Sequence, residues 1–85
     1  MKPKALVVDD SLTVRMDLVE ALQGTDFEAV GAGSVAAARE ALAGGAFDIA
    51  ILDVRLGDGD GVELLEEIRS KEEDGEARMP VMMLS

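Results

Sequence analysis

Acidic side chains follow two of the most apolar stretches of the chain, and they are the residues best suited to chemistry. Asp9 and Asp10 end the apolar run 5–8, and Asp53 ends the run 49–52. Carboxylates that gather within a few ångströms repel one another, and a bound cation relieves that repulsion. Magnesium prefers oxygen ligands and commonly takes one or two carboxylates together with a phosphate. The three acids therefore predict a magnesium site that handles phosphoryl groups.

A carboxylate can attack phosphorus and form an aspartyl-phosphate, a reaction in which the protein mainly positions groups and neutralises charge. We expect Asp53 to be this nucleophile, since it ends the more central apolar run, while the adjacent Asp9 and Asp10 are better placed to share a metal. Ser85 ends a third apolar run and is expected to hydrogen-bond the phosphoryl oxygens. Each residue alone fits a cap or a turn. The placement of all of these residues at the ends of apolar runs favours a shared phosphoryl-binding site over separate caps and turns.

Composition excludes several other kinds of site. The chain has no cysteine and no histidine, which removes disulfide scaffolds, thiol nucleophiles and most zinc sites. A net charge of −10 argues against direct binding to nucleic acid or to an anionic membrane, because both require a basic face. The apolar run near the start is far shorter than the ~20 residues that cross a bilayer. We therefore expect a cytoplasmic protein.

Strands and helices alternate along the chain. We predict strands at 5–8, 27–30, 49–52 and 80–85, with glycine-rich turns at 31–33 and 57–61. The helices are expected from residue 10 or 11 to Gly24, from Ser34 to Ala43, and over 62–68. We predict the buried rows Val14, Leu18, Ala21 and Leu22 in the first helix, Val35, Ala38, Ala41 and Leu42 in the second, and Val62, Leu64, Leu65 and Ile68 in the third.

This alternation predicts an α/β fold with a parallel sheet covered by helices on both faces. The runs 5–8 and 49–52 are apolar throughout and should be central, whereas 27–30 mixes polar and apolar residues and should lie at an edge. Right-handed crossovers bring the carboxyl ends of the strands to one rim, where open α/β sheets bind ligands. The acids and Ser85 should meet at this rim.

The order and spacing of these segments resemble the response regulator receiver domain of two-component signalling, of the kind found in chemotaxis regulators. The similarity covers the whole chain: Asp9-Asp10-Ser11 after the first strand, Arg15 in the next helix, Ile51-Leu52-Asp53 before a glycine-rich turn, Gly61-Val62-Glu63-Leu64-Leu65, and Pro80 to Ser85. The resemblance implies a flavodoxin-like, doubly wound parallel sheet with strand order 2-1-3-4.

The resemblance also implies roles for individual residues. Asp53 would accept a phosphoryl group from a sensor histidine kinase or a phosphotransfer protein, and Ser85 would be the switch hydroxyl. Asp9, Asp10 and Asp53 would hold Mg²⁺ together with the backbone carbonyl of Arg55. The chain would thus be a phosphorelay phosphoacceptor rather than an enzyme in the usual sense.

The resemblance further implies parts that residues 1–85 do not include, so we expect a single receiver domain that is incomplete at its C-terminus. The family continues with a fifth strand, a lysine at the end of that strand, and two more helices. Without them the last strand would present an open apolar edge. We expect that edge to pair with a neighbour, in an edge-mediated or swapped dimer.

Two other functions remain open at this point. One is a protein-binding or assembly module on the same fold, without phosphotransfer. The other is a dinucleotide-binding fragment, because residues 31–36 follow the pattern GxGxxA between a strand and a helix. The strand before this motif is the weakest of the four, whereas a dinucleotide site is built on a central strand.

Overall fold

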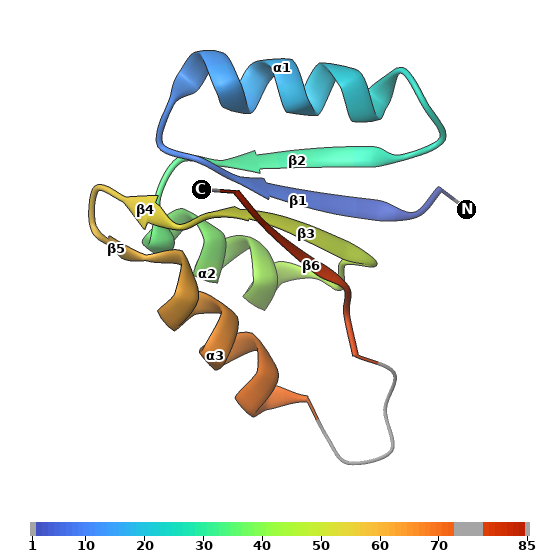
Figure 1. Cartoon of the computed structure of the whole chain (residues 1–85). Helices are drawn as coiled ribbons and strands as arrows, with labels where there is room; N and C mark the ends of the chain where they lie inside the picture. The colour runs from blue at the N-terminus through green and yellow to red at the C-terminus, as the bar shows by residue number, and fades with distance from the viewer. Residues whose placement is uncertain (1, 73–77, 85) are drawn as a thin grey trace.

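A four-stranded parallel sheet forms the centre of the molecule (Figure 1). The computed structural model describes residues 2–72 and 78–84. The strands of this sheet are β1 (Lys4–Val8), β2 (Glu28–Ala32), β3 (Ile49–Asp53) and β6 (Val81–Leu84). They lie in the order β2-β1-β3-β6, which confirms the predicted order 2-1-3-4. The polar strand β2 lies at an edge, as its composition predicted.

Three helices cover the sheet: α1 (Leu12–Gln23) on one face, and α2 (Val35–Gly44) and α3 (Gly61–Lys71) on the other (Figure 1). Each helix begins after a polar cap that accepts a hydrogen bond from a backbone N–H of the first turn. The caps are Ser11, which accepts from Val14 at 3.4 Å, Ser34, from Ala37 at 3.0 Å, and Asp60, from Val62 at 2.7 Å. None of the helices in the described residues is long and apolar enough to span a bilayer.

The hydrophobic core lies between the sheet and the α2–α3 layer. Alternate residues of the two inner strands point into it and are fully buried: Leu6, Val8, Ala50 and Leu52. The opposing helices contribute Val35, Ala38, Leu64 and Ile68. The predicted rows of α2 and α3 are thus largely confirmed. Val62 is the exception, because the buried row of α3 is Gly61, Leu64 and Ile68, and Val62 lies on another side at 42% exposure.

The predicted buried row of α1 was wrong in part. No residue of α1 is fully buried, and Val14 and Ala21 are exposed. The half-buried residues are Arg15, Leu18, Val19 and Leu22, which have the i, i+3, i+4, i+7 spacing of one helix face. The row that faces the sheet is therefore shifted relative to the prediction, since it includes a charged residue that a hydrophobic pattern does not count.

The glycine-rich stretch after β3 forms a small antiparallel hairpin, which the sequence had indicated only as a turn. Its strands are β4 (Arg55–Leu56) and β5 (Gly59–Asp60). At its tip the Asp58 carboxylate accepts hydrogen bonds from the backbone N–H groups of Val35 (2.8 Å) and Ala36 (3.2 Å). These two donors hold the pKa of Asp58 below its ordinary value. The hairpin is thereby attached to the first turn of α2.

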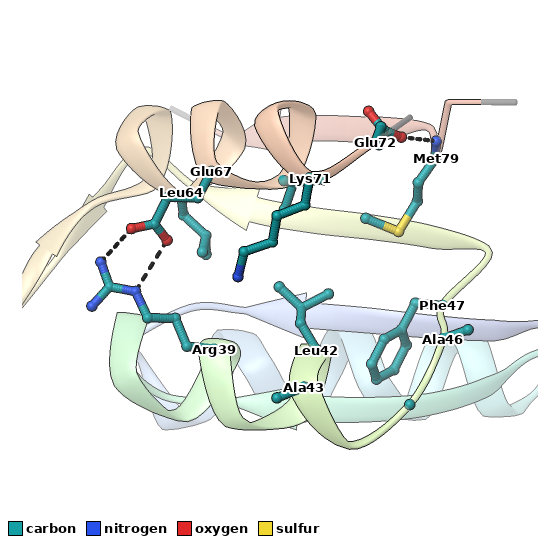
Figure 2. A pocket seen from close by; sticks show the side chains of 12 residues that line it. Arg39, Leu42, Ala43, Ala46, Phe47, Leu64, Glu67, Lys71, Glu72 and Met79 are labelled. Atoms are coloured by element: carbon teal, nitrogen blue, oxygen red, sulfur yellow. Dashed lines mark hydrogen bonds and ion pairs between the residues drawn. The ribbon is translucent and has the colours of Figure 1, made fainter. Parts of the chain in front are cut away.

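A cavity of about 440 Å³ lies between α2 and α3, with Leu42, Phe47 and Leu64 among its apolar lining (Figure 2). An ion pair and a hydrogen bond to the backbone lie at its margins. The Arg39 guanidinium donates two hydrogen bonds to the Glu67 carboxylate, at 2.6 and 3.0 Å, and joins the two helices. Glu72, at the end of α3, accepts a hydrogen bond from the backbone N–H of Met79 at 2.8 Å. This bond connects α3 to the residues that precede β6. The cavity thus belongs to the packing of the α2–α3 layer.

Candidate functional site

The acid cluster, defined as Asp9, Asp10 and Asp53, lies at the carboxyl ends of the two inner strands. β1 and β3 are parallel neighbours, with Val8 beside Leu52, so the residues that follow in each strand come together. Carboxylate oxygens of the three acids lie within 4.8 Å of one another. Asp9 is buried at 5% exposure, Asp53 is half-buried and Asp10 is exposed. The cluster therefore has a fixed inner side and a side open to solvent.

Asp9 is the most firmly held member of the cluster. Its backbone N–H donates to the carbonyl of Ala32 at 3.1 Å, which extends the pairing of β1 with β2. Its carbonyl accepts from Nη1 of Arg15 at 2.9 Å, and its Oδ1 accepts from the N–H of Ser11 at 2.9 Å. Backbone and side chain are thus both fixed, and Oδ2 has no hydrogen-bond donor among the described residues.

Asp53 is placed by the segment that follows it. Its Oδ1 accepts a long hydrogen bond, 3.4 Å, from the backbone N–H of Arg55. The N–H of Gly61 donates to the carbonyl of Val54 at 2.9 Å, so α3 begins directly against the end of β3. A side chain at Gly61 would overlap the backbone carbonyl oxygen of Asp53. Only glycine permits this close approach.

The donor set suits a hard divalent cation. All three side chains offer carboxylate oxygens, and magnesium is bound through one or two carboxylates, with further oxygen ligands completing an octahedron. Asp9, buried and oriented by three hydrogen bonds, has the rigidity that a metal ligand needs. Because Asp10 is exposed, the cluster can be reached by a cation from solvent.

The structure brings together the three predicted acids, while their roles as metal ligands and phosphoacceptor stay predictions. Arg55 lies two residues after Asp53, in β4, and coordination by its carbonyl likewise stays a prediction. Ser85 lies outside the described residues, although Leu84 before it pairs with Asp53 in the sheet.

The dinucleotide interpretation of residues 31–36 was wrong. Gly31 belongs to β2, an edge strand, rather than to a turn. The Arg15 side chain fills the space over the glycines: an added Cβ would lie 3.1 Å from Cδ of Arg15 at Gly31, and 2.8 Å from Nη1 at Gly33. The glycines make room for an arginine of the same chain, not for a pyrophosphate.

Arg15 is the residue near the site whose place was not identified from the sequence, since the resemblance gave it only a position in the first helix. A signal was present, because Arg15 falls in the same helical row as Leu18 and Leu22. A charged residue in an apolar row needs a partner when it faces a sheet. Here the partner is the carbonyl of Asp9.

Comparison with known proteins agrees with this geometry. A family model described as the response regulator receiver domain matches residues 5–85. The chain is 45% identical over 74 residues to the DNA-binding transcriptional activator DevR/DosR of Mycobacterium tuberculosis, a match that covers 84% of this chain and 34% of DevR/DosR. The chain thus spans about a third of the length of this relative.

Solved structures show the same fold. Chemotaxis response regulator CheY4 of Vibrio cholerae superposes with a TM-score of 0.88 at 26% identity, covering 98% of this chain and 68% of CheY4. Response regulator TrrA of Thermotoga maritima, determined in complex with Mg²⁺-BeF, has a TM-score of 0.80 at 32% identity, covering 98% of this chain and 66% of TrrA.

Proposed function

The chain belongs to the response regulator receiver domain family, and from this premise we propose that it accepts a phosphoryl group on Asp53. The donor is the phosphohistidine of a sensor histidine kinase or phosphotransfer protein. Asp9, Asp10, Asp53 and the carbonyl of Arg55 would hold Mg²⁺ during the transfer. Receiver domains are signalling modules, so the outcome is a changed state of the chain rather than a released product.

The observation that carries this proposal is the acid cluster itself. Three carboxylates from two neighbouring strands lie within 4.8 Å of one another at the rim where parallel α/β sheets bind ligands. Such a cluster is electrostatically unfavourable without a cation. The relative TrrA has been determined with Mg²⁺-BeF, which supports the same use of the cluster here.

The transfer needs little from the protein beyond position and charge. A carboxylate oxygen of Asp53 attacks phosphorus, a P–O bond forms, and the P–N bond of the phosphohistidine breaks. The released imidazole of the donor takes up a proton. A bound magnesium ion supplies positive charge to the phosphoryl oxygens. The chain's own part is to hold Asp9 on the buried side of the cluster and to keep Asp53 close to it and half-exposed.

Phosphorylation of Asp53 can be tested with a small-molecule donor. Incubation with Mg²⁺ and acetyl phosphate should add the mass of one phosphoryl group to the intact protein, measured by mass spectrometry. Asp53→Asn should abolish the addition, because an amide is a poor nucleophile, while Asp26→Asn, at an exposed turn, should leave it unchanged. Modification that persists in Asp53→Asn would exclude Asp53 as the acceptor.

The metal assignment has its own test. Isothermal titration calorimetry should show saturable Mg²⁺ binding that is lost in Asp9→Ala and in Asp10→Ala, since each removes one of the clustered carboxylates. Asp17→Asn, an exposed substitution on α1, serves as the matched change in charge and should bind as the unaltered chain does. Equal binding in all of these variants would contradict the assignment.

An assembly module without phosphotransfer is the second candidate, and exposed apolar residues favour it. Leu12 and Met16 on α1 are 60% and 50% exposed, and Met82 on β6 is 54% exposed. Association with another protein would cover such side chains. Two results together would support this candidate. Acetyl phosphate would fail to modify the chain under saturating Mg²⁺, and the chain would associate with another protein through these residues.

A further inference from the structure

Arg15 makes contacts that the proposed phosphotransfer does not itself require. It lies in the sheet-facing row of α1, and its side chain runs across Gly31 at the end of β2 and Gly33 in the turn that follows. Its Nη1 ends 2.9 Å from the backbone carbonyl oxygen of Asp9. One side chain thus connects α1, the end of β1 and the β2–α2 turn.

The hydrogen bond from Arg15 completes the fixation of Asp9. The Asp9 N–H is bound to Ala32, its Oδ1 accepts from Ser11, and Arg15 takes the remaining backbone group, the carbonyl. The segment between Asp9 and Ser11 turns from a strand into a helix and carries two of the three clustered acids. The carbonyl of Asp9 lies in the peptide plane that joins Asp9 to Asp10, so the hydrogen bond from Arg15 holds the backbone between two of the clustered acids.

The two glycines are explained by the same contact. A Cβ at Gly33 would lie 2.8 Å from Nη1 of Arg15, closer than such atoms approach, and a Cβ at Gly31 would lie 3.1 Å from its Cδ. A side chain at Gly33 would require the end of the Arg15 side chain to shift, and one at Gly31 would require its Cδ to move by a few tenths of an ångström. Gly44, by contrast, has no atom within 4 Å of an added Cβ.

We propose that Arg15 is a positioning residue for cation binding: it orients Asp9 by holding its carbonyl, and Gly31 and Gly33 provide the space it needs. This inference rests on the proposed role of Asp9 in binding Mg²⁺. It goes further by assigning affinity for the cation to a positively charged residue that does not touch it. Partners of this kind commonly change metal affinity 10-fold or more.

A role of Arg15 through its charge and a role through its position predict opposite effects of Arg15→Ala on Mg²⁺ affinity, so the two can be distinguished. If Arg15 acted only through its positive charge near the cluster, Arg15→Ala would tighten Mg²⁺ binding and Arg15→Lys would leave it unchanged. If it acts by position, Arg15→Ala should weaken Mg²⁺ binding about 10-fold. Arg15→Lys should weaken it too, because lysine keeps the charge but its side chain is one atom shorter than the reach of Nη1, which donates to the carbonyl of Asp9. Calorimetric titration with Mg²⁺ alone gives these values.

A double-variant comparison tests the contact with glycine. Gly33→Ala should weaken Mg²⁺ binding, but by less than Arg15→Ala does, because the guanidinium can shift, and should add no further loss when Arg15 is already alanine. Gly44→Ala is the control and should bind as the unaltered chain does. Losses that add up in the double variant would show that the two residues act separately and would overturn the proposal.

A second measurement needs no metal and keeps the inference separate from the proposed function. Hydrogen exchange of the Ser11 amide, which donates to Asp9, should be about 10-fold faster in Arg15→Ala and Gly33→Ala than in the unaltered chain, relative to amides of β3. If the unaltered chain binds no Mg²⁺, the proposed function fails and exchange alone decides the positioning role. Unchanged exchange at Ser11, or tighter Mg²⁺ binding in Arg15→Ala, would overturn the inference.

Discussion

Gly61 determines how closely α3 approaches the end of β3. A side chain there would overlap the carbonyl oxygen of Asp53, a backbone atom that cannot move aside as the end of a flexible side chain can. Gly61→Ala should therefore lower the free energy of unfolding by about 3 kcal/mol, at the upper end of the usual cost of overpacking. Urea denaturation followed by circular dichroism measures the change.

Gly57→Ala is the matched control, because no atom lies within 4 Å of an added Cβ at that position. Its effect should stay within about 0.5 kcal/mol, as for most surface substitutions. Equal losses in the two variants would mean that the glycine-rich segment is sensitive as a whole and that the contact with Asp53 is not the cause.

Single residues were predictable where the local pattern held their signal. Asp9, Asp10 and Asp53 each end an apolar run, and parallel pairing alone brings such ends together. The contact of Asp58 with Val35 leaves no comparable local trace. The helical row of Arg15 indicates that this residue faces the sheet, but not that it binds Asp9. Each depends on where a long or distant side chain reaches in three dimensions.

At the scale of elements, the β4–β5 hairpin and α2 form one connected unit through Asp58. Its pKa is lowered by the N–H donors of Val35 and Ala36, so the folded state favours the charged form. A lowered pKa stabilises the fold at pH values above the pKa of the unfolded side chain, about 3.9, and this contribution is lost as the pH falls from there through the lower pKa of the folded state.

The thermal midpoint of Asp58→Asn should accordingly be lower than that of the unaltered chain at pH 7, and the difference should shrink as the pH falls from about 5 to about 3. Thermal unfolding followed by circular dichroism across this range tests the prediction. Asp17→Asn, whose carboxylate accepts no hydrogen bond among the described residues, should show a much smaller pH-dependent difference. A difference for Asp58→Asn that is constant with pH would exclude a contribution from its ionised form.

Element boundaries followed from polar caps and glycines, because these groups act on their immediate neighbours. Ser34 marked the start of α2, and Gly24 the end of α1. The buried face of α1 was misassigned, since Arg15 rather than Val14 faces the sheet. The hairpin was missed as a pair of strands because each strand has only two residues, too few to show an alternating pattern.

For the molecule as a whole, the central and edge positions of the strands could be predicted from their apolar or mixed composition, and the order 2-1-3-4 from the resemblance to the receiver family. The net charge of −10 follows directly from the sequence, and the repulsion between acidic copies opposes self-association. β6 is nevertheless the outermost strand of the described sheet, and Met82 on it is 54% exposed. Pairing of a second copy along β6 therefore stays our proposal.

That pairing should depend on salt. Raising the ionic strength from about 0.05 to about 0.5 M shortens the screening length and weakens the repulsion between acidic copies, so the dimer fraction should rise. Analytical ultracentrifugation measures it. Met82→Lys should reduce dimerisation by placing a charge on the edge strand, whereas Met16→Lys, at a similarly exposed position on α1, should not. Dimerisation that falls with salt, or that both variants weaken equally, would contradict pairing along β6.

The parallel register of β1 and β3 has a consequence for folding. Val8 lies beside Leu52, and only this alignment brings Asp9 next to Asp53. A slip of one residue would turn every side chain of a strand to the opposite face and separate the acids. A cation that binds the assembled cluster stabilises only the aligned sheet, by mass action. The same ion that serves the chemistry would thus select the correct strand alignment during folding.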